Sequence, residues 1–335
     1  MNLKGKKVLV TGGSGFIASH LVQRLQNEQS DVAILTKYDS VIDNVRLALQ
    51  WEDLRIIEGD IRNQDSLKLV SQFHPVIVFH FAAYNHVGDS FTHVSEALDS
   101  NAKGSANLLE AYTEYEKFIY ISTSEVYGFQ KTVPFVETMQ PNPISPYAVG
   151  KYTGEMYARM KHYVNNLPIA VIRPFNAFGP YQSPRAVIAE MIIKCLSGKT
   201  ITSTEGKQTR EFNFVENLID GIILAAESDK SIGQVINIGC GQEISIRDLI
   251  LKIHKLTEST SELQIGKLSY RPTEIWRMFA DDTKARNLLD WQPKISFDEG
   301  LERTIDWYRH FLEVYKGNSS LRSLAYDQFH PSHQS

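Results

Sequence analysis

Short, strongly hydrophobic runs alternate with helix-like patterns through the first half of the chain. Between the runs, apolar residues recur at spacings of three and four, which indicates amphipathic helices. The first such helix has apolar positions at Phe16, Ile17, Leu21, Val22 and Leu25. The predicted strands cover residues 8–10, 32–35, 55–58, 76–81, 118–121 and 169–172. Apolar strands separated by helices are typical of a parallel sheet covered on both faces.

The pattern becomes irregular from about residue 174, where short helical segments mix with a possible strand at 199–202. The apolar run 234–239 predicts a late strand that returns to the first sheet, and 297–315 predicts a last amphipathic helix. We therefore expect an α/β fold, with a doubly wound parallel sheet and a smaller C-terminal mixed α/β lobe. The expected division is 1–175 plus a returning segment 213–240 for the sheet domain, 176–212 and 241–316 for the lobe, and 317–335 for a polar tail.

Composition narrows the class of protein without naming an activity. A chain of 335 residues suits two lobes at roughly 150 residues each, and 42% apolar residues suffice for a large core. The formal charge of −4 argues against a nucleic-acid binder, which is usually basic. Two cysteines, Cys195 and Cys240, provide no disulfide framework, and no Cys/His spacing suggests a metal site. Without a signal-like or membrane-spanning apolar run, we expect a cytoplasmic protein with no membrane partner.

A glycine-rich segment between the first predicted strand and helix indicates a dinucleotide site. Gly12 permits a tight turn, Gly15 lets a pyrophosphate approach the backbone, and the small Ala18 lets the helix pack on the strand. The helix N-terminus then offers unpaired N–H groups to a phosphate. A plain tight turn is the alternative.

The end of the second predicted strand bears on the choice between NAD and NADP. An acidic residue there would bind the ribose 2′-hydroxyl of NAD, but this strand ends in Thr36 and Lys37. A lysine at this position suits the 2′-phosphate of NADP, so we favour NADP without excluding NAD. The alternative is that Lys37 points to solvent and contacts neither dinucleotide. Asp60, after the third strand, is a candidate acceptor for the adenine amino group or a helix cap.

Tyr147 and Lys151 lie four residues apart and so on one face of a predicted helix. A free tyrosine is a poor base at neutral pH, and we expect the nearby cation to lower its pKa. Thr123 and Glu125 follow the fifth strand, at the edge where ligands bind such sheets. Glu125 is a candidate general base or a surface carboxylate, and Asn101 is a candidate holder of a water in a proton relay or a plain helix-surface amide.

Five segments together resemble the extended short-chain dehydrogenase/reductase family. They are residues 11–17 (TGGSGFI), 81–83 (FAA), 122–128 (STSEVYG), 145–151 (SPYAVGK) and 173–180 (RPFNAFGP). The resemblance covers residues 6 to about 313 and implies a Rossmann domain with a nucleotide-sugar lobe. Within the family, the Thr-Ser-Glu and Ser-Pro-Tyr-Ala segments resemble nucleotide-sugar 4,6-dehydratases, including GDP-mannose 4,6-dehydratases. Residues 181–188 and 209–215 resemble the dehydratases of legionaminic-acid pathways, which act on nucleotide-linked N-acetylglucosamine.

The resemblance implies a role for each matching residue. Catalysis would involve Thr123, Ser124, Glu125, Tyr147 and Lys151. The dinucleotide would contact Gly12, Ser14, Gly15, Phe16, Ile17, Lys37, Asp60, Ile61, Ala82, Ala83, Asn101, Tyr147 and Lys151. The nucleotide sugar would contact His86, Ser90, Asn176, Arg185, Val187, Arg210 and Arg271, with Arg210 and Arg271 clasping the diphosphate.

The implied reaction oxidises C4 of the sugar, eliminates water across C5 and C6, and reduces C6. Tyr147 would take the 4-hydroxyl proton and Glu125 the C5 proton. The dTDP-glucose enzymes carry an Asp where this chain has Ser124, a poor acid, so Glu125 is expected to serve as base and then as acid. A UDP-glucuronate decarboxylase, a 4-epimerase, a 5,6-dehydratase and a cofactor-binding regulator remain open as alternatives. The family also implies a homodimer paired through helices near 91–116 and 145–166.

Overall fold

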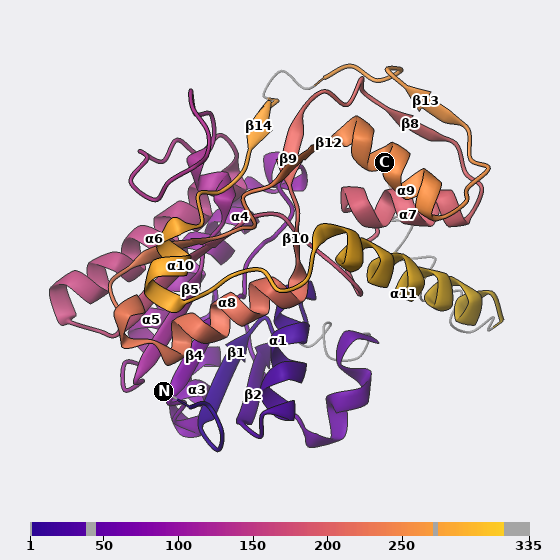
Figure 1. Ribbon diagram of the computed structural model, residues 1–335. Helices are drawn as coiled ribbons and strands as arrows, with labels where there is room; N and C mark the ends of the chain where they lie inside the picture. The colour runs from indigo at the N-terminus through magenta and orange to yellow at the C-terminus, as the bar shows by residue number, and fades with distance from the viewer. Residues whose placement is uncertain (1, 38–44, 271–273, 318–335) are drawn as a thin grey trace.

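A seven-stranded parallel sheet lies in the lower part of the molecule as viewed in Figure 1. The computed structural model describes residues 2–37, 45–270 and 274–317. The strand order β11-β6-β5-β4-β1-β2-β3 shows that the chain starts in the middle of the sheet and winds outward in both directions, which confirms the predicted Rossmann fold. The strands are β1 (Lys7–Thr11), β2 (Asp31–Thr36), β3 (Arg55–Glu58), β4 (Ile77–His80), β5 (Lys117–Ile121), β6 (Ile169–Pro174) and β11 (Val235–Ile238).

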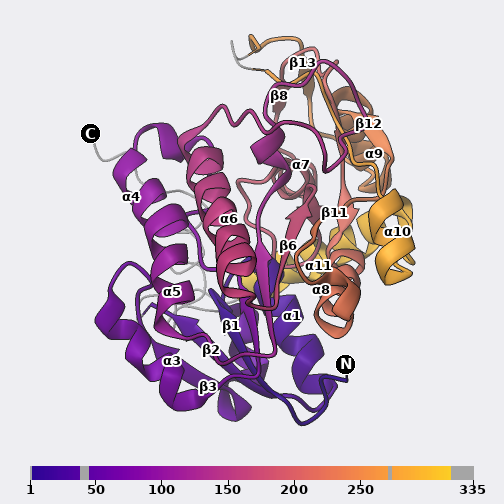
Figure 2. The ribbon, with the colours of Figure 1, turned by 90° about the vertical axis from the view of Figure 1, so that its left-hand side faces the viewer.

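Helices cover both faces of this sheet (Figures 1 and 2). Val8 and Val10 of β1 belong to the apolar core on one face, and Leu9 between them belongs to the core on the other, as expected from side chains that alternate along a strand. The first face carries α1 (Phe16–Asn27), α8 (Val215–Glu227) and α10 (Thr283–Leu289), and the second carries α3 (Lys68–Phe73), α5 (Ser105–Ala111) and α6 (Pro146–Asn165). Both faces are therefore buried, which explains why the strands are apolar throughout.

The smaller lobe lies above the carboxyl ends of the strands (Figure 1). Its three main helices, α7 (Val187–Leu196), α9 (Ile246–Leu256) and α11 (Phe297–Gly317), share a separate apolar core. The strand expected at 199–202 is β8 (Ile201–Ser203). The irregular pattern hid the other short strands, which are β7 (Ala177–Phe178), β9 (Thr209–Glu211), β10 (Asn213–Phe214), β12 (Glu243–Ser245), β13 (Leu263–Ile265) and β14 (Arg277–Met278).

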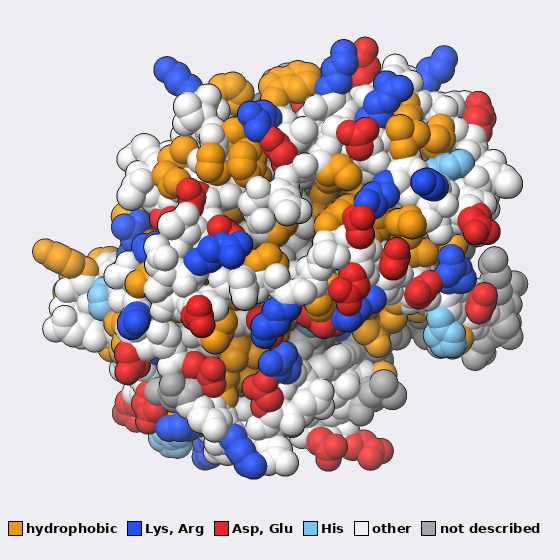
Figure 3. Space-filling model, viewed as in Figure 1, with side chains coloured by type: hydrophobic (Ala, Val, Ile, Leu, Met, Phe, Trp, Pro, Cys, Tyr) orange, Lys and Arg blue, Asp and Glu red, His pale blue; other side chains and the backbone are white. Residues whose placement is uncertain are grey.

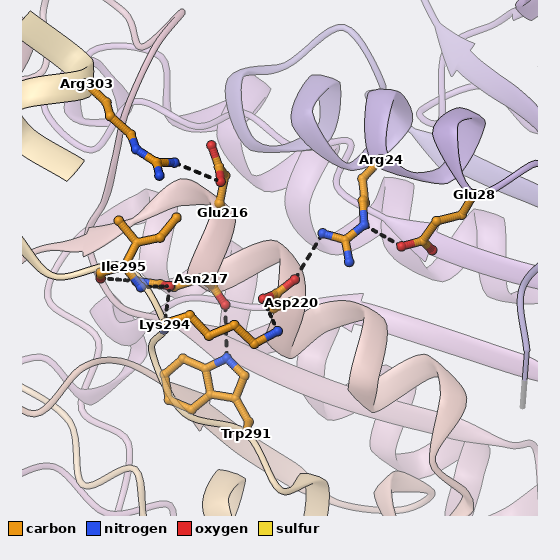
Figure 4. Close-up of polar contacts among 9 residues, drawn as sticks. All are labelled: Arg24, Glu28, Glu216, Asn217, Asp220, Trp291, Lys294, Ile295 and Arg303. Atoms are coloured by element: carbon orange, nitrogen blue, oxygen red, sulfur yellow. Dashed lines mark hydrogen bonds and ion pairs between the residues drawn. The ribbon is translucent and has the colours of Figure 1, made fainter. Parts of the chain in front are cut away.

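Helix α8 joins the C-terminal part of the chain to the sheet domain (Figure 4). Asp220 forms ion pairs with Arg24 of α1 at 3.1 Å and with Lys294 at 2.9 Å. The side chain of Asn217 accepts hydrogen bonds from the backbone N–H groups of Lys294 and Ile295. The strand β11, which follows α8, pairs with β6. Segments from late in the sequence thus complete the first domain.

Charged side chains of both signs are interspersed over the face shown in Figure 3. This arrangement fits the near-balanced formal charge of −4. Within the described residues, no helix is both long and apolar enough to span a membrane. The predicted polar tail lies, from residue 318 onward, outside the described residues.

Candidate active site

The turn between β1 and α1 forms the floor of a groove at the carboxyl edge of the sheet. Gly12 has a φ of +66°, and a Cβ there would lie 2.9 Å from backbone atoms of Ala82, so only glycine fits where the two loops meet. The helix α1 begins directly after Gly15, without a side-chain cap on its first N–H groups. These free donors suit a pyrophosphate, so the turn fits the predicted dinucleotide.

Two connected cavities run along this edge. The first, of about 460 Å³, has a lining that includes the predicted cofactor residues Gly12, Ser14, Gly15, Lys37, Asp60, Ile61, Ala82 and Ala83. The second, of about 270 Å³, has a lining that includes Gly12, Gly15, Phe16, Ile17, Thr123, Ser124, Tyr147, Lys151 and Asn176. Because they share Gly12, Gly15 and Ala83, one long ligand can occupy both. The two linings suit the predicted dinucleotide, and Tyr147 and Lys151 line the second cavity.

The described residues at the end of β2, Thr36 and Lys37, include no carboxylate. Thr36 is buried there, with its hydroxyl 3.1 Å from that of Ser14, and the exposed Lys37 follows. Both carboxylate oxygens of Asp60 accept hydrogen bonds from Arg62, which lowers the pKa of Asp60. Asp60 is thus already engaged, and its role toward adenine stays a prediction.

Tyr147 and Lys151 lie in the first turns of α6, which Ser145 caps by accepting a hydrogen bond from the N–H of Ala148. Burial raises the pKa of Tyr147 to about 12, although a hydrogen bond with Thr123 lowers it in part. Burial lowers the pKa of Lys151 to about 7. The expected lowering of the Tyr147 pKa by Lys151 is therefore wrong: desolvation is the largest influence on Tyr147 and raises its pKa.

Glu125 stands at the start of a 3₁₀ turn, Ser124–Tyr127, whose N-cap is Thr123. Burial raises the pKa of Glu125, the charge of Arg210 lowers it, and the charge of Glu274 raises it. A carboxyl group whose pKa lies above its ordinary value is a candidate for proton transfer. The neighbouring Ser124 is buried and donates its hydroxyl to Sδ of Met278 at 3.6 Å.

Comparisons with known proteins agree with the dinucleotide site that this geometry indicates. The family model for GDP-mannose 4,6-dehydratase matches residues 9–304. The chain belongs to this family. A dTDP-D-glucose 4,6-dehydratase from Homo sapiens is 32% identical over 93% of this chain and 92% of its own length.

Two solved structures resemble the whole fold. The epimerase Mth375 from Methanothermobacter thermautotrophicus superposes with a TM-score of 0.87 at 31% identity, covering 94% of this chain and 96% of that one. The dTDP-glucose 4,6-dehydratase DesIV from Streptomyces venezuelae, solved with NAD bound, gives 0.84 at 28% identity, covering 92% of this chain and 99% of that one. These comparisons confirm the expected family and its NAD(P)-dependent lyase chemistry.

The expected substrate-contacting residues that the structure describes do not all line the same cavity. Arg210 of β9 lies near Glu125 and pairs with Glu274, with 2.8 Å between Nη2 and Oε1. Asn176 lines the Tyr147 cavity and donates to the backbone carbonyl of Glu211. Val187 begins α7. Arg271 lies outside the described residues.

Arg185 and His86 instead line the dinucleotide cavity. Arg185 pairs with Asp89 through two contacts of 2.8 Å, and the ring of His86 accepts a hydrogen bond from the backbone N–H of Asp89. Ser90 is fully buried and donates to the carbonyl of Val87. The expected sugar contacts of Arg185, His86 and Ser90 remain predictions. Arg185 and His86 line the cavity that fits the dinucleotide, and the side chain of Ser90 is buried.

The side chain of Asn101 connects two segments of the structure by hydrogen bonds. It lies in a π-helical turn, Asp99–Gly104, between α4 (Val94–Leu98) and α5. Its amide oxygen accepts from the N–H of Tyr84, and its amide nitrogen donates to the carbonyls of Tyr84 and Tyr147. The side chain thus ties the loop after β4 to the start of α6, and its role toward a water stays a prediction.

Sequence reasoning missed two buried groups next to the site. His80, at the end of β4, contacts the hydroxyls of Thr11 and Ser105, and burial lowers its pKa to about 3. Ser105 donates to a backbone carbonyl, so the neutral ring donates to Ser105 and accepts from Thr11. Glu211, at the end of β9, accepts from the N–H groups of Cys240 and Ala280. The sequence could have indicated His80, because it is a polar residue at the end of an otherwise apolar strand.

No cluster of three metal-ligating side chains occurs in the described parts of the chain. The residues of the two cavities fit NAD(P): glycines at the point of closest approach, open N–H donors at α1, and Tyr147 with Lys151 at the far end. When bound, NAD(P) accepts a hydride from the substrate and returns it.

Proposed function

We propose that this protein converts a nucleoside-diphosphate hexose to its 4-keto-6-deoxy derivative, and that GDP- or UDP-N-acetylglucosamine is the substrate. The observation that carries the reaction type is the half-buried Glu125, whose carboxyl group stands beside Tyr147 and Arg210. The resemblance of residues 181–188 and 209–215 to dehydratases of nucleotide-linked N-acetylglucosamine supports the choice of sugar.

Two side chains, Tyr147 and Glu125, carry out the two proton transfers of the proposed reaction. Thr123 holds the phenol of Tyr147 by a hydrogen bond, so that Tyr147 can take the proton of the 4-hydroxyl as C4 is oxidised. The resulting ketone acidifies the C5 proton, which Glu125 removes. A 4-epimerase has no step that requires this carboxyl group, and this difference favours the dehydratase.

Stopped incubations with GDP- and UDP-N-acetylglucosamine, and with a UDP-uronate in a separate reaction, are followed by mass spectrometry to test the proposal. A loss of 18 mass units means dehydration, a loss of 44 with a UDP-uronate means decarboxylation, and no change leaves the epimerase or the regulator. A 5,6-dehydratase also loses 18 units, but its product has no 4-ketone and is separated by NMR. Glu125→Gln should retain dinucleotide binding and stop product formation.

We further propose NADP as the preferred dinucleotide and a homodimer as the working state. Lys37 in place of an acidic residue supports NADP. Exposed apolar side chains on one stripe of α6, at Val149, Met156, Met160 and Tyr163, support pairing with a second copy. The cytoplasm remains the expected compartment.

A further inference from the structure

A fully buried histidine contacts the residue that precedes the glycine turn. His80 is the last residue of β4, and its ring packs against those of Phe118 and Tyr120, with centroids 6.0 and 5.6 Å away. Nδ1 of the ring lies 2.8 Å from the hydroxyl of Thr11, and Nε2 lies 3.0 Å from that of Ser105. Because burial lowers the pKa of His80 to about 3, the ring is neutral and has one donor and one acceptor nitrogen.

The hydrogen bonds on the two sides of this ring run in one direction. The hydroxyl of Ser105 donates to the backbone carbonyl of Asn101 at 2.7 Å, so it accepts from Nε2 of His80. Nδ1 then accepts the proton of the Thr11 hydroxyl, and Thr11 in turn accepts from the N–H of Ala82 at 3.1 Å. His80 therefore determines which way both hydroxyls point.

Both ends of this series of hydrogen bonds lie on the loop that follows β4. The series begins at the N–H of Ala82 and ends at Asn101, whose side chain accepts from the N–H of Tyr84 at 2.7 Å. The same side chain donates to the carbonyl of Tyr84 at 3.0 Å. Ala83, between the two fixed residues, lines both cavities of the groove. The loop is thus held on either side of a residue that faces the dinucleotide site.

The loop and the glycine turn are in close contact at the groove. A Cβ at Gly12 would lie 2.9 Å from backbone atoms of Ala82, and Thr11, directly before Gly12, holds the N–H of Ala82. A buried donor without an acceptor is unfavourable. Without Nδ1 of His80, the Thr11 hydroxyl would have to turn toward another acceptor, and its hold on Ala82 would weaken.

We propose that His80 is a positioning residue for the dinucleotide, and that it fixes the distance between the glycine turn and the loop 82–84. His80 is fully buried and lines neither of the two cavities, so it acts through Thr11 and Ser105 rather than by contact with the ligand. The inference concerns the dinucleotide site and does not depend on which sugar nucleotide is the substrate.

Two amide substitutions separate the two contacts of the ring. In His80→Asn, the amide oxygen can take the place of Nδ1 and accept from Thr11. In His80→Gln, the amide nitrogen can take the place of Nε2 and donate to Ser105. Calorimetry on protein stripped of dinucleotide measures the Kd for NAD and for NADP. We expect His80→Gln to weaken the binding of both about 10-fold, and His80→Asn to stay within about 3-fold of wild type.

Urea unfolding of the same variants distinguishes positioning from plain support of the fold. Glutamine is nearly as long as histidine, whereas asparagine is shorter and leaves a cavity beside Phe118 and Tyr120. We therefore expect His80→Asn to be the less stable of the two variants. Positioning by His80 predicts that the more stable variant is the weaker binder, and a purely structural role predicts the reverse.

Two further substitutions serve as controls. In Thr11→Val the hydroxyl is absent, so the addition of His80→Gln should weaken dinucleotide binding by less than about 2-fold more. Ser231 is buried at the other end of the strands, where it donates to the carbonyl of Ala225 and accepts from Lys117, the first residue of β5. Ser231→Ala should lower the stability of the protein and leave the Kd within about 2-fold of wild type.

Three results would overturn the proposal. One is a dinucleotide affinity that falls equally in both variants of His80, or more in His80→Asn. Another is a Kd of His80→Gln within about 2-fold of wild type. The third is a full further loss of binding when His80→Gln is added to Thr11→Val, which would show that His80 does not act through Thr11.

Discussion

Glu155 and Arg173 form a fully buried ion pair beneath the active site, with 2.6 Å between Oε1 and Nη2. Glu155 lies on α6, one turn beyond Lys151, and its charge raises the pKa of that lysine against the effect of burial. It also accepts a hydrogen bond from Ser122 at the end of β5. One carboxylate thus links β5, β6 and α6 directly behind the reacting groups.

Replacing this carboxylate should therefore destabilise the protein strongly. Glu155→Gln leaves the buried guanidinium of Arg173 without a counterion, and we expect the free energy of unfolding to fall by about 3–5 kcal/mol. Urea unfolding followed by circular dichroism measures the change. Glu299→Gln, which breaks an exposed pair with Arg303, should cost less than about 0.5 kcal/mol. Equal effects of the two substitutions would contradict the structural reading.

The hydrogen bond between Thr123 and Tyr147 gives a second prediction. It lowers the pKa of Tyr147, which burial has raised to about 12, so Thr123→Ala should raise that pKa further. We expect kcat to fall about 10- to 100-fold at pH 7 and the rising limb of the pH–rate profile to move to higher pH. Thr123→Ser, which keeps a hydroxyl, should restore most of both. A lower kcat with an unmoved profile would show that Thr123 acts by packing alone.

Local patterns predicted the sheet because each strand is a short apolar run and each helix between the strands has apolar residues at spacings of three and four. The glycine turn and the Tyr147–Lys151 pair were found for the same reason, since each lies within eight residues of sequence. The direction of the Tyr147 pKa shift was wrong, because the sequence shows the nearby lysine but not the depth at which both groups are buried.

Contacts between distant segments escaped prediction. Arg210 meets Glu274 across 64 residues of sequence, and Arg185 meets Asp89 across 96. The residues around each arginine in the sequence give no indication of its acidic partner. The partners meet only because the small lobe packs over the edge of the sheet. The position of the arginines relative to the two cavities therefore had to come from the structure.

The apolar stripe on α6 makes the homodimer testable. Met160 is 39% exposed and lies in the same stripe as the exposed Met156 and Tyr163. A carboxylate at this position would be desolvated between two copies, so Met160→Asp should convert the dimer to monomers in light scattering coupled to size-exclusion chromatography. Leu69→Asp, at a similarly exposed apolar position on α3, should leave the mass unchanged. A wild-type monomer at micromolar concentration would reject the dimer outright.

Lys37 should decide the choice of dinucleotide. It follows the last residue of β2 and lines the groove that also holds Ser14. A lysine contacting a 2′-phosphate is worth about 1.5–3 kcal/mol, so Lys37→Ala should weaken NADP binding about 10- to 100-fold and leave NAD binding nearly unchanged. Calorimetry on protein stripped of dinucleotide measures both affinities. Lys68→Ala, a distant exposed lysine, is the control, and an equal loss for both dinucleotides would remove Lys37 from the 2′ site.

Glu211 should give the folded protein a distinctive pH dependence. Burial raises its pKa from 4.5 to about 7, so between these values the folded state holds a proton that the unfolded chain has released. The contribution of Glu211 to the free energy of unfolding should therefore fall as pH rises through this window, by about 3 kcal/mol, whereas the lowered pKa of His80 contributes in the opposite direction below pH 6.5. Urea midpoints of the dinucleotide-free protein from pH 5 to 8 measure the slope.

Glu211→Gln should remove this contribution, so the difference in stability between wild type and the variant isolates it. The amide cannot titrate, but it can accept at only one oxygen, so either the N–H of Cys240 or that of Ala280 loses its partner. The variant is therefore expected to be about 1–3 kcal/mol less stable than wild type at pH 5, and to approach wild type as pH rises to 8. Glu302→Gln, at an exposed position on α11, should keep the wild-type slope. A stability difference between wild type and Glu211→Gln that does not change with pH would contradict the titration of Glu211 in this window.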